Sequence, residues 1–327
     1  MSSEGSTKAV LAALLANTGI AVLKFLAFLL TGASSMLAEA IHSVADSGNQ
    51  GLLLLGGKRA TREATEQHPF GFGRERYIYS FLVAIVLFSV GGLFALYEAY
   101  HKAHEVHAGL PNAFLDGRWW WVAIVVLVGA MVMEALSFRT AVTESNKTRG
   151  TASWFEFVRR AKSPELPVIL LEDLAALVGL SSALLGVGFS KLTGNGYFDV
   201  AGTAAIGLLL VSVAVVLGIE TKSLLLGEAA SPDAQRRLLA GLEQTPGIER
   251  VIHMKTLHLG PEELLVAVKI AVPQAARAAD VATSIDAAER AMRAAEPTAR
   301  MIFVEPDIFV AGHQPDPRPA APASPGH

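Results

Sequence analysis

The sequence predicts an α-helical membrane protein with six transmembrane helices, followed by a C-terminal cytoplasmic α+β domain of αββαβ order. Composition and pattern both predict this fold class. Hydrophobic residues make up 52% of the 327 residues and charged residues only 17%, whereas an ordinary soluble domain carries about 25% charge. The apolar residues also gather in segments of about 20 residues, the length that a helix needs to cross a lipid bilayer.

The predicted spans follow one another closely, and a turn at Thr31 and Gly32 separates the first from the second. The first segment is too long for the apolar part of a signal peptide and contains Lys24, so we interpret it as a membrane helix. The six spans run approximately over Val10–Leu30, Ala33–Gly57, Tyr77–Tyr100, Trp119–Ala141, Pro167–Phe189 and Tyr197–Ile219.

The basic residues lie mainly in alternate loops, which predicts an orientation. The loop after the second span and the loop after the fourth are rich in Lys and Arg, whereas the other loops have few. By the positive-inside rule, both termini are expected in the cytoplasm. The N-terminus has no Arg-rich amphipathic segment of the kind found in transit peptides, so we expect a bacterial inner membrane.

The pattern after residue 227 is that of a soluble domain. Ser231 is a predicted N-cap followed by a proline, which begins a helix that ends near Gln244. Strands are predicted over Ile248–Leu259 and Leu264–Val272, a helix over Asp280–Ala295, and a last strand over Met301–Val304. We expect a transmembrane domain over 1–227, a cytoplasmic domain with its helices on one face of a sheet over 228–310, and a disordered Pro/Ala-rich tail over 311–327.

Several function classes are excluded by composition and motif. The chain has no cysteine, which excludes a disulfide scaffold, thiolate catalysis and iron–sulfur clusters. Its net charge of -3 argues against a nucleic-acid partner, which requires a basic face. No nucleophile motif, phosphate loop or His-Glu-x-x-His pattern is present, so we do not expect an enzyme.

Ionisable side chains inside predicted spans are costly and usually functional. In the second span, Glu39, His42 and Asp46 lie at i, i+3 and i+7, which places them on one helix face. The fifth span contains Glu172 and Asp173, which as neighbours point about 100° apart. One imidazole with two or three carboxylates predicts a divalent-cation site between these spans. The alternative is that these groups pair with each other and hold the helices together.

Other embedded polar groups are weaker signals. Asn17 and Asn49 are expected either to support the site as second-shell donors, with Glu39, or to pack helices together. Lys24 is expected to pair with a carboxylate or to extend to the interface. We expect Glu134 near a span end, at the membrane interface. The loop residues His101, His104 and His107 either collect metal or are simply solvated.

Three motifs resemble one family, the cation diffusion facilitators. They are the run Glu39-Ala40-Ile41-His42-Ser43-Val44-Ala45-Asp46-Ser47-Gly48-Asn49-Gln50-Gly51, then His68-Pro69-Phe70-Gly71-Phe72, then Leu170-Leu171-Glu172-Asp173. Within the family they resemble the branch of the zinc transporter nine of animal mitochondria. The resemblance implies a homodimer, joined by its cytoplasmic domain, that exports Zn²⁺ or a related divalent ion in exchange for protons by alternating access. It implies no cofactor beyond the transported metal.

The resemblance assigns His42 and Asp46 as ligands from the second span and Asp173 from the fifth. The chain departs from the family pattern at Ile169, where a histidine ligand is expected, and Glu172 is the candidate substitute. An oxygen in place of a nitrogen would favour harder ions, so Mn²⁺, Fe²⁺ or Co²⁺ are alternative cargoes. Of an auxiliary metal site before the third span only His68 remains. A non-transporting metal sensor or scaffold on the same fold is the alternative function.

Overall fold

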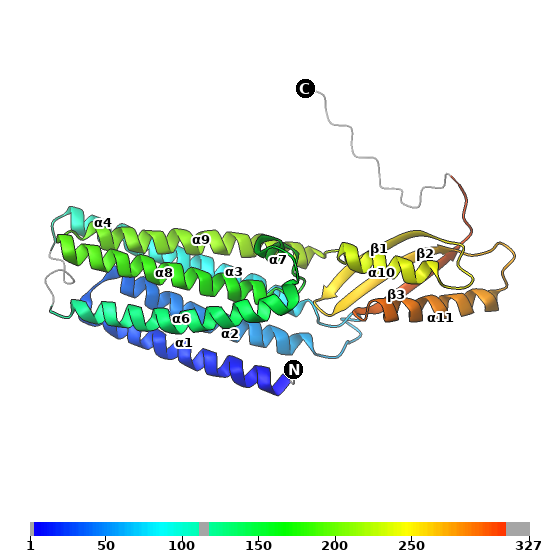
Figure 1. Ribbon diagram of the computed structural model, residues 1–327, viewed down its shortest axis with the longest axis horizontal. Coiled ribbons are helices and arrows are strands. Elements are labelled where there is room, and N and C mark those ends of the chain that lie inside the picture. The colour runs from blue at the N-terminus through cyan, green and yellow to red at the C-terminus, as the bar shows by residue number, and fades with distance from the viewer. Residues whose placement is uncertain (1–2, 111–117, 312–327) are drawn as a thin grey trace, which may run out of the picture. The chain divides into compact units, whose positions relative to one another are not determined.

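The computed structural model describes residues 3–110 and 118–311 and divides into two compact units at Leu226 and Gly227. Except for residue 311, the predicted tail lies outside the described residues. Long helices that run alternately up and down form the first unit (Figure 1). They are α1 (Ser3–Thr31), α2 (Ser34–Ala60), the continuous run of α3 (Glu75–Val86), the π-helical segment η1 (Leu87–Leu93) and α4 (Phe94–His107), α6 (Trp120–Arg149), α8 (Glu165–Thr193) and α9 (Tyr197–Leu226).

Four helical stretches in the described residues are long and apolar enough to cross a membrane, namely Glu75–His107, Trp120–Lys147, Glu165–Thr193 and Tyr197–Leu226. The described apolar part of α1, Asn17–Thr31, is shorter. The helix α2 has 27 residues, but polar side chains interrupt its apolar character. They are the side chains that the sequence analysis identifies as functional candidates. A helix that buries a polar face inside a bundle needs less apolar surface than a helix that faces lipid, so its hydropathy is lower.

Two helices extend further than the predicted spans. The third predicted span ends at Tyr100, but α4 continues to His107, so His101, His104 and His107 are exposed on the last turns of a helix and not in a loop. The fourth predicted span ends at Ala141, but α6 continues to Arg149. Hydropathy ends a span where charged residues begin, whereas a helix continues for as long as its backbone hydrogen bonds are formed.

Glycines bring the backbones of α8 and α9 into contact. A Cβ atom at Gly186 would lie 2.8 Å from the carbonyl oxygen of Phe198, and one at Gly202 would lie 2.7 Å from that of Ser182. Both distances are too short for any side chain. Likewise, Gly207 of α9 packs directly against Leu96 of α4. Small residues on facing helices allow such close approach.

Asp199, in the first turn of α9, caps the N-terminus of α2. Its carboxylate accepts hydrogen bonds from the backbone N–H and hydroxyl groups of both Ser34 and Ser35, at 2.5–3.4 Å. A helix N-terminus has unsatisfied N–H groups and a partial positive charge, which favour a carboxylate at this place. This contact fixes the end of α2 that lies two helical turns before His42.

The second unit confirms the predicted αββαβ order. Its elements are α10 (Pro232–Glu243), β1 (Arg250–Gly260), β2 (Glu263–Ala271), α11 (Ala278–Ala295) and β3 (Ala299–Asp307). The sheet order is β1-β2-β3, with β1 antiparallel and β3 parallel to β2. The Ser231 hydroxyl accepts a hydrogen bond from the Ala234 N–H, as expected of an N-cap. Leu238, Leu242 and Met292 of the helices pack on the sheet in one apolar core.

Candidate metal site

The polar residues of α2 form one buried face. Glu39, His42, Asp46 and Asn49 follow one another at helical spacing, and each exposes 4% of its surface or less. Apolar residues of α2 pack into the bundle core around them. A helix with such a face must find polar partners on its neighbours, because a buried polar group without a partner destabilises the fold.

Toward α1, this face forms a complete ion pair. Lys24 Nζ lies 2.9 Å from Glu39 Oε2 and donates a second hydrogen bond of 2.8 Å to Ser43 Oγ, with both charged groups fully buried. The expectation that Lys24 pairs with a carboxylate is thus confirmed. The other oxygen of Glu39 lies against Gly179 of α8, where a Cβ atom would lie only 2.9 Å away. The pair joins α1 to α2 and leaves the Glu39 charge neutralised.

Toward α8, the same face is not balanced. His42 Nδ1 lies 3.4 Å from Asp46 Oδ1, too far for a good hydrogen bond at this pair, and neither ring nitrogen of His42 has a hydrogen-bond partner. The carboxyl groups of Asp46 and Glu172 lie within hydrogen-bonding reach of each other. Asn49 Nδ2 donates a hydrogen bond of 2.8 Å to Glu172 Oε1. This hydrogen bond holds the Glu172 side chain toward α2 and joins α2 to α8.

Glu172, and not Asp173, is thus the fifth-span carboxylate that faces α2. Asp173 accepts a hydrogen bond of 2.9 Å from Ser137 Oγ and so lies toward α6. The two side chains diverge because they are neighbours on one helix. The resemblance assigned Asp173 as a ligand and Glu172 as the candidate substitute for the histidine missing at Ile169. Of the two carboxylates, Glu172 lies beside Asp46 and Asp173 lies toward Ser137.

Glu134 is a member of this polar region that the sequence analysis placed at the interface. That prediction is wrong, because Glu134 exposes only 5% of its surface and lies at the middle of α6, which continues beyond the predicted span. Its charge acts on Asp46, Glu172 and Asp173. The full length of the helix was the missing signal, since a charged residue in the middle of a long apolar helix lies at membrane depth.

In this conformation the acidic groups do not form a closed set of metal ligands. Among the described residues, no group of three or more His, Asp or Glu side chains converges tightly enough to hold an ion. His42, Asp46 and Glu172 lie together between α2 and α8, and Asp173 lies on the neighbouring face with Ser137. A metal bound by all four candidate ligands therefore requires the side chains of α8 to move.

The weaker candidates are placed as follows. His68 is exposed in the segment after α2, and its ring lies 4.7 Å from that of Phe72. The guanidinium of Arg62 covers the same Phe72 ring at 4.5 Å. His68 is therefore part of an aromatic and cationic stack. Asn17 is half-buried on α1. Ile169 packs in a small apolar cluster with Phe157 of the short helix α7 (Trp154–Arg160), so no metal ligand occupies that position.

A bundle of apolar helices with a buried, partly unbalanced acidic face defines an integral membrane protein built to handle a cation. Residues 10–226 match the family described as the cation efflux transmembrane domain. The chain therefore belongs to the cation diffusion facilitator family, and within it to the zinc transporter nine branch.

Three relatives illustrate the match. The chain is 33% identical to the proteins of mouse and human named "Proton-coupled zinc antiporter SLC30A9, mitochondrial", over 260 and 259 residues that make up 79% of this chain and 44% of each relative. It is 27% identical to "Metal tolerance protein C4" of Arabidopsis thaliana over 263 residues, which are 80% of this chain and 56% of the relative. The chain thus spans about half the length of these relatives.

Proposed function

We propose that the protein exports divalent metal cations, with Zn²⁺ as the first candidate cargo, in exchange for protons. The observation that carries the proposal is the unbalanced cluster of His42, Asp46 and Glu172 between α2 and α8. Two carboxyl groups so close together in a low-dielectric interior repel each other unless a cation lies between them. A proton or a divalent metal ion can fill that role, and the two ions would therefore compete for one place.

The ligand types support a transition-metal or zinc cargo. The imidazole of His42 has no hydrogen-bond partner at either nitrogen, so one lone pair is available to a metal. A nitrogen with two carboxylate oxygens suits Zn²⁺, and it also suits Mn²⁺, Fe²⁺ and Co²⁺. The two mammalian relatives are named as zinc antiporters, which ranks Zn²⁺ first. We propose Asp173 as an accessory carboxylate, which Ser137 holds toward α6.

Proton exchange follows from the same residues. Metal binding requires a neutral imidazole and ionised carboxylates, so protonation of the site releases metal. In alternating access, the cluster would open first to the side with the lower proton concentration and load metal there. It would then open to the more acidic side, where protons displace the metal. The imidazole of His42 and the carboxyl groups of Asp46 and Glu172 are the groups that can take up these protons.

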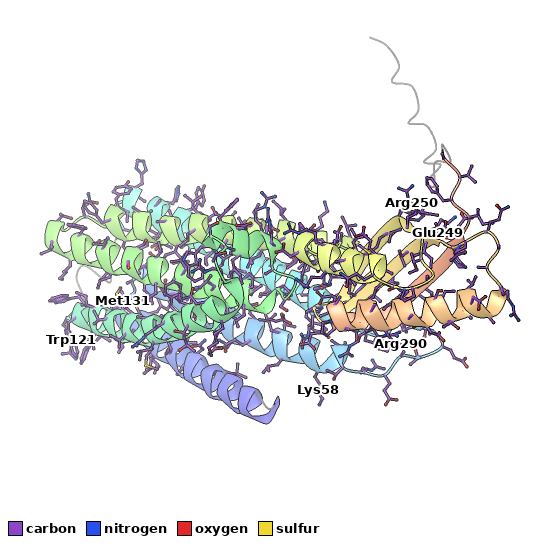
Figure 2. All side chains as sticks on the ribbon, turned by 45° about the vertical axis from the view of Figure 1, so that its right-hand side comes forward. Lys58, Trp121, Met131, Glu249, Arg250 and Arg290 are labelled. Carbon is purple, nitrogen blue, oxygen red and sulfur yellow. The ribbon has the colours of Figure 1, made fainter. Side chains whose placement is uncertain are left out.

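We further propose a homodimer in a bacterial inner membrane with both termini in the cytoplasm. The charge distribution of the bundle supports this orientation. Lys58, near the end of α2, and Trp121, near the beginning of α6, lie at opposite ends of the helical unit (Figure 2). The basic residues of 58–76 and 147–162 belong to the Lys58 end, because α2 and α6 end there and α3 and α8 begin there. That end is the cytoplasmic one by the positive-inside rule.

The experiment that tests this function is metal flux into proteoliposomes with purified protein. Zn²⁺, Mn²⁺, Fe²⁺, Co²⁺ and Cd²⁺ are compared, each with and without a pH gradient, and Asp46→Ala is the matched inactive control. Flux that is stimulated by the gradient and lost in the variant supports a proton-coupled exporter and ranks its cargoes. If folded protein moves none of these metals, the proposal fails in favour of a sensor or scaffold.

A further inference from the structure

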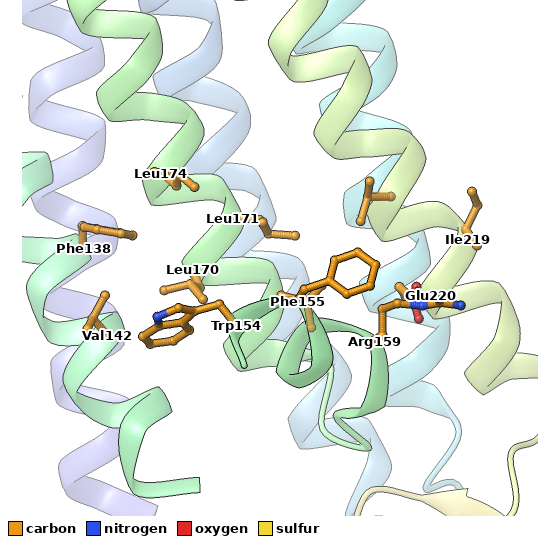
Figure 3. A pocket seen from close by; sticks show the side chains of 12 residues that line it. Phe138, Val142, Trp154, Phe155, Arg159, Leu170, Leu171, Leu174, Ile219 and Glu220 are labelled. Carbon is orange, nitrogen blue, oxygen red and sulfur yellow. Dashed lines mark ion pairs between the residues drawn. The ribbon is translucent and has the colours of Figure 1, made fainter. Parts of the chain in front are cut away.

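A cavity opens on the side of α8 that faces away from α2 (Figure 3). It has a volume of about 840 Å³ and lies between the short helix α7 and the helices α6, α8 and α9. This volume is within the range of about 300–1,000 Å³ that is typical of pockets for small organic ligands. None of the proposed metal ligands lines the cavity.

The walls of the cavity are almost entirely apolar. Phe138 of α6, Leu174 of α8 and Ile219 of α9 form its sides, and Trp154 and Phe155 of α7 cover it (Figure 3). Several of these side chains are strongly exposed, with Phe155 at 72% and Ile219 at 61%. So much exposed apolar surface is unfavourable in water and is stable against the hydrocarbon chains of a bilayer.

The depth of the cavity agrees with an interfacial position. It lies near the end of α6, the beginning of α8 and the end of α9. Leu170 is the sixth residue of α8, so it lies only about 8 Å along the helix axis from the first residue. A Trp at this level, as Trp154 of α7 is, is typical of the aromatic belt where lipid headgroups meet hydrocarbon.

The rim of the cavity is basic. The segment 147–162 carries five Lys or Arg residues and a single acidic residue. Arg149 lies over the Trp154 ring at 4.3 Å, and its guanidinium donates hydrogen bonds to neutral acceptors, the side-chain oxygen of Asn146 and the carbonyl oxygen of Ala152. Arg159 lies at the mouth of the cavity, 3.5 Å from Glu220 (Figure 3). Lys147, Arg159 and Arg160 pair with Glu144, Glu220 and Glu156, so Arg149 carries the positive charge that an anionic ligand head would meet at this rim.

We propose that this cavity binds an acyl chain of an anionic phospholipid from the surrounding bilayer, with the phosphate held at the Arg149–Arg159 rim. The occupant is a lipid and not a second copy of the chain, because the site is concave and has a charged rim. An interface between copies instead requires a broad complementary surface of about 800 Å² on each partner. The lipid chain would pack on Leu170 and Leu174 of α8. Glu172 lies on another face of the same helix.

Photo-crosslinking in nanodiscs tests the proposal. The full chain is placed in discs of equal parts phosphatidylcholine and phosphatidylglycerol, with a trace of phosphatidylglycerol that carries a diazirine on one acyl chain. After irradiation, mass spectrometry maps the labelled peptides. We expect label concentrated on residues 138–142, 170–174 and 216–219. The same diazirine on phosphatidylcholine should label these residues less.

Matched variants make the test specific. Leu174→Trp fills the cavity and should lose the label there. Leu192→Trp makes the same change on α8 at a position that is 82% exposed and outside the cavity, and it should keep the label. Val216→Trp fills the cavity from α9 and replaces Leu174→Trp in the experiment if that variant does not fold. Replacing Arg149 and Arg159 together by Gln should remove the preference for phosphatidylglycerol.

Three results would overturn the proposal. Label spread evenly over the lipid-facing side chains of α6, α8 and α9 would mean that the cavity holds no particular lipid. Label unchanged in both filling variants would place the lipid elsewhere. Crosslinks at these positions to a second copy of the chain would make the face a protein interface.

Discussion

Two polar clusters lie one turn apart on α2, and they differ in how their charges are balanced. In the first, Lys24 neutralises Glu39 at 2.9 Å and also bonds Ser43. In the second, Asp46 and Glu172 face each other, and His42 lies beside them with both nitrogens unpartnered. No Lys or Arg in the described residues forms an ion pair with Asp46 or Glu172. Burial is the same for both clusters, so burial alone does not distinguish structure from function.

This contrast separates a polar cluster that holds two helices together from one that can take up a cation. A cluster with its own cation is complete and contributes to joining α1 and α2. A cluster without a cation of its own has uncompensated negative charge, which a mobile cation can neutralise. We therefore expect changes in the first cluster to affect mainly folding, and changes in the second to affect mainly metal binding. Four experiments test this contrast.

The largest effect is expected at the open cluster. Losing a residue that only supports a metal ligand typically lowers metal affinity by about 10–100-fold. Glu172→Gln should lower zinc affinity by more than this, and Asp173→Asn should lower it within this range. The reason is that Glu172 faces Asp46 and Asn49, and Asp173 faces Ser137. Competition against a fluorescent zinc indicator at neutral pH measures both affinities. A larger loss for Asp173→Asn would return the ligand role to Asp173.

The next effect is expected at the closed cluster. Lys24→Met leaves the Glu39 carboxylate buried without its cation, which typically costs about 3–5 kcal/mol in the free energy of unfolding. The double variant with Glu39→Gln should recover much of this loss, because no unpaired charge remains. Unfolding in detergent micelles measures both variants. If Lys24→Met unfolds like the wild type but does not transport zinc, the pair belongs to the transport machinery and the comparison fails.

A smaller effect is expected at Asp199, a third buried carboxylate whose oxygens accept hydrogen bonds from Ser34 and Ser35. Asp199→Ala removes a helix cap and a favourable charge at the α2 N-terminus, so it should cost about 1–2 kcal/mol of stability. Zinc affinity should not change. Asp199→Asn keeps one hydrogen-bond acceptor, so its stability should lie between those of the wild type and Asp199→Ala. A strong loss of zinc affinity without a loss of stability would contradict the contrast, because it would mean that a carboxylate with all its hydrogen bonds formed can still act in metal binding.

The smallest effect is expected in the C-terminal unit, where solvent reaches the charges. Hydrogen bonds to Glu305 and Asp307 raise the pKa of Lys269 above its ordinary value of 10.5. The stabilisation from this cluster is therefore fully present below pH 10.5 and is lost as pH rises through the raised pKa. NMR titration of a methyl-labelled lysine in the full chain measures the pKa, and Asp307→Asn should lower it. An unchanged pKa in that variant would contradict the assignment.

The sequence was sufficient to predict the α2 face, because positions 39, 42 and 46 repeat at helical spacing in an apolar span. It was also sufficient for the αββαβ order, since turns and strand patterns are local. The sequence was not sufficient to predict which of Glu172 and Asp173 faces α2. That choice depends on the rotation of α8 about its own axis, which is set by contacts such as that between Gly179 and Glu39.

Two other features needed more than a hydropathy window. Glu134 lies at membrane depth because α6 continues to Arg149 through a polar last part. The helix α7 begins with Ser153, whose hydroxyl accepts a hydrogen bond from the Glu156 N–H. A serine followed three residues later by a glutamate is the sequence signature of a helix start, so this helix could have been predicted. The cavity that it covers could not, because three distant segments form its walls.

The glycine contact between α8 and α9 has a consequence for divergence within the family. If Glu172 substitutes for a ligand missing at Ile169, as we propose, single ligand side chains can be exchanged between relatives. Gly186 and Gly202 have no such freedom, because even a methyl group at either position would lie within 3 Å of a carbonyl oxygen on the other helix. Relatives with different metal preferences should therefore keep both glycines wherever α8 and α9 pair in this way, and a lineage that lost one would have to separate the two helices.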